Sequence, residues 1–223
     1  MLLPRLPRHG LADRFTSEMA GLNAAELKAA VEQALDIATG LGRKVTAAGL
    51  SLGGVLTAHL ALKRDDLDRA VIISPLFAAP DLPEIASGMT GLIARMLPNK
   101  FVWWDGQAKA AIAGPAYAYP RFPTRGYGAM LTVGAEVKRA ARTTRLRARE
   151  VRVVVNAADP AVNNDATRNL VKLWRSRGEA VAYHEFAREL ELLHDLISPE
   201  QTKQRIDIVY PVLMRWIDAA RVG

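Results

Sequence analysis

The sequence predicts one α/β domain, with a mostly parallel sheet and helices on both faces of that sheet. Short runs of β-branched and apolar residues alternate with segments of helical period, which is the pattern of βαβ crossovers. The length of 223 residues suits one hydrophobic core rather than two. Half of the residues are apolar and 24% are charged, a composition that excludes disordered and fibrous chains. We therefore expect residues 1–223 to form a single domain.

Four short apolar runs predict strands, and helical patterns lie between and around them. The expected strands are residues 44–50, 69–74, 151–157 and 180–186. The expected helices are residues 24–39, 52–62, 165–177 and 199–217. Asn23 is the expected N-cap of the first helix, with Glu26 at the capping-box position. Ser198 is the expected N-cap of the last helix, followed by Pro199 at the first helical position and Gln201 at the capping-box position.

The segment of residues 76–130 differs in composition from the rest of the chain. It holds most of the prolines and most of the aromatic residues, and it falls between the second and third expected strands. Two interpretations are open: a cap over a functional site, or a packed helical subdomain that contacts no ligand. For any single aromatic residue here the second interpretation is favoured, because aromatic side chains dominate protein cores.

A G-x-S-x-G pentapeptide, residues 49–53, lies between an expected strand and an expected helix. A sharp strand-to-helix turn would hold the hydroxyl of Ser51 at the carboxyl edge of the sheet, and the flanking Gly49 and Gly53 would permit so tight a turn. The backbone N–H of Leu52 would then lie at a helix N-terminus, where it can stabilise an oxyanion. The context therefore predicts Ser51 as a nucleophile and Leu52 as an oxyanion donor.

A serine nucleophile needs a general base, which is normally a histidine held by a carboxylate. Of the four histidines, His59 lies within a helix, His184 lies within a strand, and His9 precedes the serine. The chain order of this motif is serine, acid, histidine. His194, in the loop after the fourth strand, is therefore the predicted base.

Two aspartates compete for the role of the acid. Asp159 directly follows the third expected strand, at the same carboxyl edge as Ser51. Asp165 lies six residues further on, near a helix start, where an aspartate is commonly a cap or a first-turn charge. Position favours Asp159.

Together these motifs resemble the α/β-hydrolases of the carboxylesterase and monoacylglycerol-lipase type. The elbow around Ser51, the Ala158-Asp159-Pro160 segment and the Leu193-His194-Asp195 segment follow the order of that family. The resemblance implies a serine hydrolase that cleaves a small-molecule carboxylic ester, short-chain or monoacylglycerol-like, through an acyl-enzyme and without a cofactor or metal. It also implies that residues 76–130 form a lid or cap over an acyl pocket.

The beginning of the family pattern is missing, although the resemblance runs from Leu2 to the last helix. Family members carry three strands and a helix before the loop that residues 4–10 resemble, and that part supplies the second oxyanion donor. We expect the strand at residues 45–50 to lose a neighbour, which leaves an exposed sheet edge open to a homo-oligomer. Met1 as a misassigned start is one hypothesis. A catalytically impaired or non-catalytic truncated homologue is the alternative function, because loss of one oxyanion donor costs about 10²–10³ in rate.

The net charge of +7 is concentrated in one segment. Residues 138–152 hold seven basic residues and one acid, whereas the rest of the chain holds 23 basic and 22 acidic residues. Because no aromatic residue in this segment could stack on bases, we expect a solvated helical face leading into a strand, and no nucleic-acid partner. A binding protein that uses this segment, with steep salt dependence, is a third hypothesis.

Two absences limit the function further. The sequence has no cysteine, which excludes disulfides, thiolate metal sites and cysteine nucleophiles. No apolar run approaches the roughly 18 residues of a membrane-spanning helix. We therefore expect no transmembrane segment and a cytoplasmic location.

Overall fold

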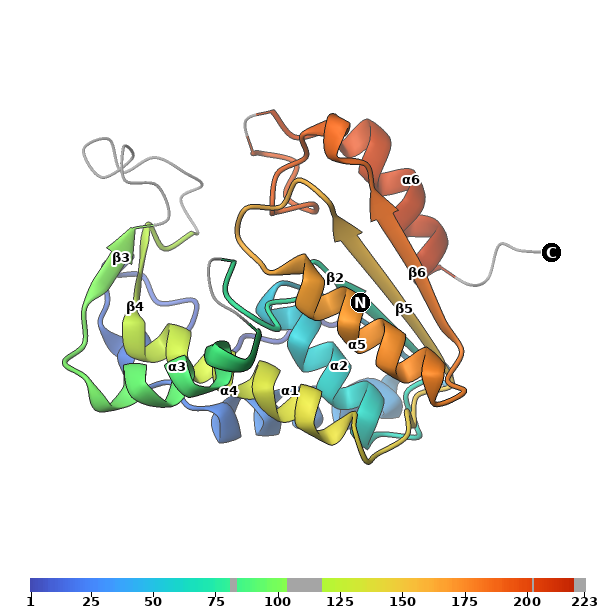
Figure 1. Cartoon of the computed structure of the whole chain (residues 1–223), viewed down its shortest axis with the longest axis horizontal. Helices are drawn as coiled ribbons and strands as arrows, with labels where there is room; N and C mark the ends of the chain where they lie inside the picture. Colours follow the sequence, from blue (N-terminus) through green and yellow to red (C-terminus); the bar gives the residue numbers. More distant parts are fainter. Residues whose placement is uncertain (81–83, 104–117, 202, 219–223) are drawn as a thin grey trace.

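A four-stranded, all-parallel sheet forms the centre of the structure. The computed structural model describes residues 1–80, 84–103, 118–201 and 203–218. The order of the strands across the sheet is β1-β2-β5-β6 (Figure 1). Their bounds are β1 Thr46–Leu50, β2 Arg69–Ile73, β5 Glu150–Asn156 and β6 Val181–Phe186. All four expected strands are present, and the predicted α/β class is confirmed.

Helices cover both faces of this sheet. Their bounds are α1 Ala24–Leu41, α2 Leu52–Lys63, α3 Glu84–Met96, α4 Thr124–Ala140, α5 Asn164–Ser176 and α6 Ile206–Ile217, with short 3₁₀ turns η1 Glu18–Gly21 and η2 Arg188–Leu190. The expected N-cap of α1 is confirmed, because the side chain of Asn23 accepts a hydrogen bond of 2.9 Å from the backbone N–H of Glu26. α6 lies on the opposite side of the sheet from α2 and α5 (Figure 1).

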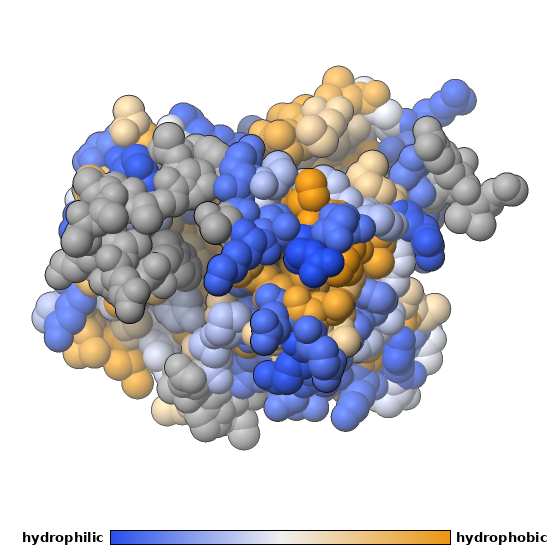
Figure 2. Space-filling model, turned by 90° about the horizontal axis from the view of Figure 1, so that it is seen from above, coloured by the Kyte–Doolittle hydropathy of each residue, from blue (hydrophilic) through white to orange (hydrophobic). Residues whose placement is uncertain are grey.

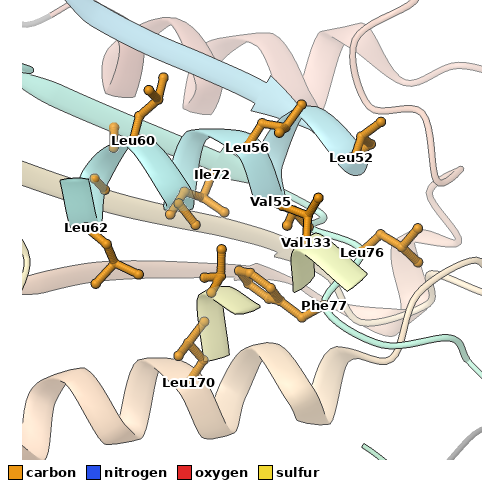
Figure 3. Close-up of a cluster of buried hydrophobic side chains, with 14 of the residues drawn as sticks. Leu52, Val55, Leu56, Leu60, Leu62, Ile72, Leu76, Phe77, Val133 and Leu170 are labelled. Carbon is orange, nitrogen blue, oxygen red and sulfur yellow. The ribbon is translucent and has the colours of Figure 1, made fainter. Parts of the chain in front are cut away.

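Side chains on the two faces of β2 belong to two different apolar clusters, because successive side chains of a strand point to opposite faces of the sheet. Ala70 and Ile72 belong to the larger cluster, with residues of α1, α2, α4 and α5. Val71 and Ile73 belong to a smaller cluster under α6. Figure 3 shows the larger cluster, in which Ile72 and Phe77 lie among side chains of α2 and of the elements that carry Val133 and Leu170. Every residue of β2 is buried, as the middle of a doubly covered sheet requires.

Between β2 and β5 the chain leaves the sheet and forms α3, an antiparallel pair of short strands, and α4. The paired strands are β3 Phe101–Trp103 and β4 Arg121–Pro123. The expected boundary near residue 130 falls inside α4, whose later side chains Val133 and Val137 are buried in the larger cluster. α4 is thus shared between the expected cap and the sheet domain. Residues 81–83 and 104–117 of the expected cap lie outside the described residues.

The last helix begins later than the sequence predicts. α6 starts at Ile206, and residues 198–201 form a turn in which Gln201 N–H donates to the carbonyl oxygen of Ser198. The expected N-cap at Ser198 is wrong because a turn forms there instead of a helix: the Asp195 carboxylate accepts the N–H groups of Ile197 and Ser198, each at 3.0 Å. Two glutamine side chains then donate to this turn instead of starting a helix.

β1 lies at the edge of the sheet, as expected, with β2 as its only strand partner among the described residues. Thr46 and Ala48 are exposed on this strand. A mainly apolar groove of about 360 Å³ runs beside the free edge, lined by the strand, by α1 and α2, and by Met1, Leu2 and other residues of the N-terminal segment. As expected, β1 therefore has no strand neighbour on this side among the described residues.

The basic segment of residues 138–152 covers the end of α4 and the start of β5. Several of its arginines form ion pairs: Arg145 with Glu179, Arg149 with Asp68, and Arg152 with Glu150. Arg152 also donates to carbonyl oxygens at the end of α6, at 3.0 and 3.2 Å, where a cation complements the helix dipole. No helix in the described part of the chain is long and apolar enough to cross a membrane.

Candidate active site

Ser51 occupies a strained turn between β1 and α2. Its φ of 56° and ψ of −114° place a non-glycine residue in a region of positive φ, which costs on the order of 1–3 kcal/mol. Backbone hydrogen bonds hold the turn: Ser51 N–H donates to the carbonyl oxygen of Ile73 at 2.9 Å, and Ser51 carbonyl oxygen accepts from Leu76 at 3.2 Å. The end of β2 and the residues that follow it thus hold the serine at the carboxyl edge of the sheet.

Glycines make this turn possible, but not the pair that the sequence predicts. A Cβ on Gly49 would lie 2.2 Å from the carbonyl oxygen of Gly53, so only glycine fits there. A Cβ on Gly54 would lie 2.9 Å from the carbonyl oxygen of Ile73. A Cβ on Gly53 would meet no atom within 4 Å, because Gly53 borders the groove beside β1. The turn needs Gly49 and Gly54, and the expected requirement for glycine at position 53 is wrong.

Leu52 lies where an oxyanion donor is expected. It is the first residue of α2, so its backbone N–H has no acceptor within the helix. Its side chain is buried in the larger cluster, which fixes the direction of the backbone. The partial positive charge of the α2 N-terminus adds to the field at this point.

Asp159 and His194 form a direct pair. His194 Nδ1 lies 2.8 Å from Asp159 Oδ2, and the Asp159 side chain has no exposed surface. The other carboxylate oxygen accepts the N–H of Ala161 at 2.9 Å. An ionised carboxylate can only accept, so Nδ1 carries the proton and Nε2 is left as an acceptor. This is the tautomer that a general base requires.

The competing acid and histidines lie in other surroundings. The Asp165 side chain is 81% exposed, in the first turn of α5, and pairs with Arg168 at 2.7 Å. His59 lies 2.8 Å from Glu32, between α2 and α1. His184 packs edge-on against Phe186 and Trp216. His9 Nδ1 lies 2.8 Å from the carbonyl oxygen of Pro7, in the N-terminal segment.

Ser51 and His194 are brought to the same edge of the sheet but are not joined. The strands β1 and β6, which precede them, run parallel, so their carboxyl ends share that edge. Among the described residues no hydrogen bond links the Ser51 hydroxyl to the His194 ring. Such contacts are commonly long without substrate.

Two residues that hold the histidine loop were missed from the sequence. Asn156 at the end of β5 is fully buried and hydrogen-bonds to that loop. Asp195 holds the turn after the histidine; burial opposes its ionisation, but hydrogen bonds from Ser198, Ile197 and Gln201 lower its pKa. An Asx turn signalled by Asp195 and Ser198 was readable in the sequence. Nothing local marks Asn156.

Charged side chains lie near Asp159 in a small surface pocket. A pocket of about 250 Å³ next to Asp159 is lined by Asn164, Arg168 and Arg188, among others. Arg168 pairs with Glu185 of β6 and lowers the pKa of that carboxyl. Within the described ranges no group of three or more histidine or acidic side chains is arranged to hold a metal ion.

The face above the strand ends carries both apolar and polar surface. Figure 2 views the molecule from the side toward which β5 and β6 point in Figure 1, and it shows hydrophobic residues near the centre between hydrophilic ones. An exposed apolar patch with a polar rim is typical of a ligand or interaction surface.

A comparison with family models matches residues 1–198 to the alpha/beta hydrolase family. The chain belongs to this family. No curated protein matches the sequence of this hydrolase.

Solved structures of similar fold include lipolytic enzymes. One of two metagenome-derived lipolytic enzymes, LipS and LipT, is 19% identical with a TM-score of 0.59, over 82% of the hydrolase and 69% of that chain. The monoacylglycerol lipase of Paleococcus ferrophilus is 17% identical with a TM-score of 0.58, over 88% and 76%. A soluble variant of the Saccharomyces cerevisiae monoglyceride lipase, in complex with a substrate analogue, is 15% identical with a TM-score of 0.60, over 87% and 68%. At these identities the likeness concerns the fold.

Proposed function

We propose that this hydrolase cleaves carboxylic esters through an acyl-enzyme on Ser51. The observation that carries the proposal is the pair of the buried Asp159 carboxylate and the half-buried His194, at the same sheet edge as a serine held at positive φ. A strained polar residue and, at the same edge, a base held by a carboxylate are the components that nucleophilic catalysis uses.

In this mechanism Ser51 Oγ attacks the ester carbonyl carbon while His194 Nε2 takes the hydroxyl proton. The resulting oxyanion accepts a hydrogen bond from the Leu52 N–H. Collapse of the tetrahedral intermediate expels the alcohol, which receives the proton from His194. A water molecule then attacks the acyl carbon while His194 takes its proton. Collapse of this second tetrahedral intermediate breaks the bond between Ser51 Oγ and the acyl carbon, His194 returns the proton to Ser51 Oγ, and the carboxylic acid leaves. Asp159 keeps Nδ1 protonated and stabilises the imidazolium that forms in each step.

The proposed substrate is a small carboxylic ester, short-chain or monoacylglycerol-like. Support comes from the lipolytic and monoacylglycerol-lipase neighbours, which share the fold. Residues 76–130 are the proposed cap over the acyl group, since this segment leaves the sheet between β2 and β5. The substrate class is testable with p-nitrophenyl esters of increasing chain length beside a monoacylglycerol.

The competing function is that of a catalytically impaired homologue. Two observations favour it: Ser51 and His194 share no hydrogen bond in the described part of the chain, and β1, which carries the elbow, has a free edge. Without a second oxyanion donor the rate would fall by about 10²–10³.

Labelling with a fluorophosphonate probe, followed by peptide mass spectrometry, separates the two functions. We expect an adduct on Ser51 that is absent in Ser51→Ala and in His194→Ala. His59→Ala is the matched control, because His59 pairs with Glu32 between two helices and is expected to leave labelling intact. A folded wild-type protein without an adduct would refute the serine mechanism and establish the impaired homologue.

A further inference from the structure

Asn156 lies at the last position of β5, between the loop that carries Asp159 and the loop that carries His194. Its side chain is among the few fully buried polar groups of the described residues. A buried amide costs stability unless its donors and acceptor find partners, so the contacts of this side chain show what it holds.

The amide nitrogen of Asn156 holds the histidine loop. Nδ2 donates to the carbonyl oxygen of Leu192 at 2.8 Å and to that of Leu193 at 3.2 Å. These are the two residues directly before His194. The ladder between β5 and β6 ends earlier, where Asn156 pairs with Phe186, so the ladder itself does not reach the histidine.

The oxygens of Asn156 hold the acid loop. The side-chain Oδ1 accepts the N–H of Ala158 at 3.0 Å. The main-chain oxygen accepts the N–H of Asp159 at 3.1 Å and the side-chain amide of Asn164 at 2.7 Å. One residue therefore binds the acid loop through its acceptors and the histidine loop through its donors.

This division of roles fits only an amide. An aspartate would keep the acceptor toward Ala158 but would turn a second acceptor toward two carbonyl oxygens. Apolar packing of Leu192 under α6 also retains the loop, but such packing is not directional. Hydrogen bonds fix both distance and direction, which the 2.8 Å contact between Asp159 and His194 requires.

We infer that Asn156 is a positioning residue that sets the distance between Asp159 and His194. The inference rests on the proposed serine mechanism for its effect on turnover, although the geometry it concerns exists without substrate. A residue that only filled the core would affect stability alone.

The test compares Asn156→Asp with Asn169→Asp, which introduces the same charge at an exposed position of α5. Steady-state hydrolysis of a p-nitrophenyl ester gives kcat and KM. Proton NMR gives the resonance of the His194 Nδ1 proton, assigned by its loss in His194→Gln. Asn156→Ser is the second variant, since its neutral hydroxyl can still donate one hydrogen bond, and it replaces the aspartate variant if that variant does not fold.

We expect kcat of Asn156→Asp to fall on the order of 10²-fold with KM little changed, because a misplaced base impairs chemistry rather than binding. The His194 Nδ1 proton resonance is expected to shift or disappear, Asn156→Ser to lie between Asn156→Asp and wild type, and Asn169→Asp to match wild type. Folded Asn156 variants with wild-type kcat and an unchanged His194 resonance would overturn the inference. If the wild type hydrolyses no ester, the serine mechanism fails, and the resonance alone then decides the role of Asn156.

Discussion

The two glycines that flank Ser51 in the elbow are expected to respond in opposite ways to alanine. Gly49→Ala places a Cβ 2.2 Å from the carbonyl oxygen and 2.3 Å from the carbonyl carbon of Gly53, where ordinary van der Waals contact begins at 3.4 Å. Both atoms belong to the backbone, so no side-chain rotation relieves the overlap. Gly53→Ala places its Cβ in open space.

The magnitudes follow from these distances. Overpacking typically costs 1–3 kcal/mol, and a clash with backbone belongs at or above the upper end, about 3 kcal/mol for Gly49→Ala. For a domain of this length that lowers Tm by about 6–12 °C. Gly53→Ala replaces a glycine near the start of α2 by a better helix former, which stabilises by up to about 1 kcal/mol. Its Tm is expected to stay or to rise by a few degrees.

Thermal unfolding followed by circular dichroism measures both effects on the purified variants. Fluorophosphonate labelling adds a local readout, since Gly49→Ala displaces the turn that carries Ser51, whereas Gly53→Ala leaves it in place. Equal destabilisation by both substitutions, or a neutral Gly49→Ala, would refute the reasoning about the elbow.

Three further predictions concern the acid, a half-buried histidine and the free edge. Asp159→Asn is expected to lower kcat about 10⁴-fold by favouring the wrong His194 tautomer, while Asp165→Asn stays near wild type in the same ester assay; similar losses in both would contradict the assignment. Burial lowers the pKa of His184, so stability is full above the pKa of an exposed imidazole and falls as pH drops toward the folded value. Denaturant titrations between pH 7 and pH 5 are expected to show a shallower loss in His184→Phe, and identical pH dependence would exclude this histidine as the cause. If β1 pairs with a second copy, light scattering gives a dimer for wild type and a monomer for Ala48→Lys, because a lysine on an edge strand blocks strand addition; equal masses would contradict pairing there.

Strands and most helices were predictable because their signals are local. The β-branched run of β5 and the Asn23 cap of α1 need only a few neighbouring residues to be recognised. The start of α6 was not, because Ser198 has good capping chemistry. In the structure the N–H of Gln201, which an N-cap at Ser198 would accept, donates to the main-chain oxygen of Ser198 in a turn that Asp195 holds.

The residues of the candidate site were predictable from the sequence, but several contacts that hold them were not. Order along the chain and position after strands were enough to select Ser51, Asp159 and His194, and the structure joins the last two. The need for glycine at position 54 depends on the carbonyl oxygen of Ile73, which lies on a neighbouring strand. The contacts of Asn156 depend likewise on loop carbonyls 36 and 37 residues away. Local sequence patterns do not show such contacts between residues that are far apart in the sequence.

The position of the elbow on an edge strand has a consequence for how the hydrolase would lose activity. In the part of the chain that the structure describes, β1 pairs with a strand on one side only, whereas β5, which precedes the acid, pairs on both sides. Local opening starts where fewest contacts must break, so β1 can fray while the remaining sheet is intact. Amide exchange would then be faster in β1 than in β5, and the enzyme would inactivate below its melting temperature. The temperature up to which the hydrolase stays active would then depend on whether the five residues of β1 remain paired, and not on the stability of the whole domain.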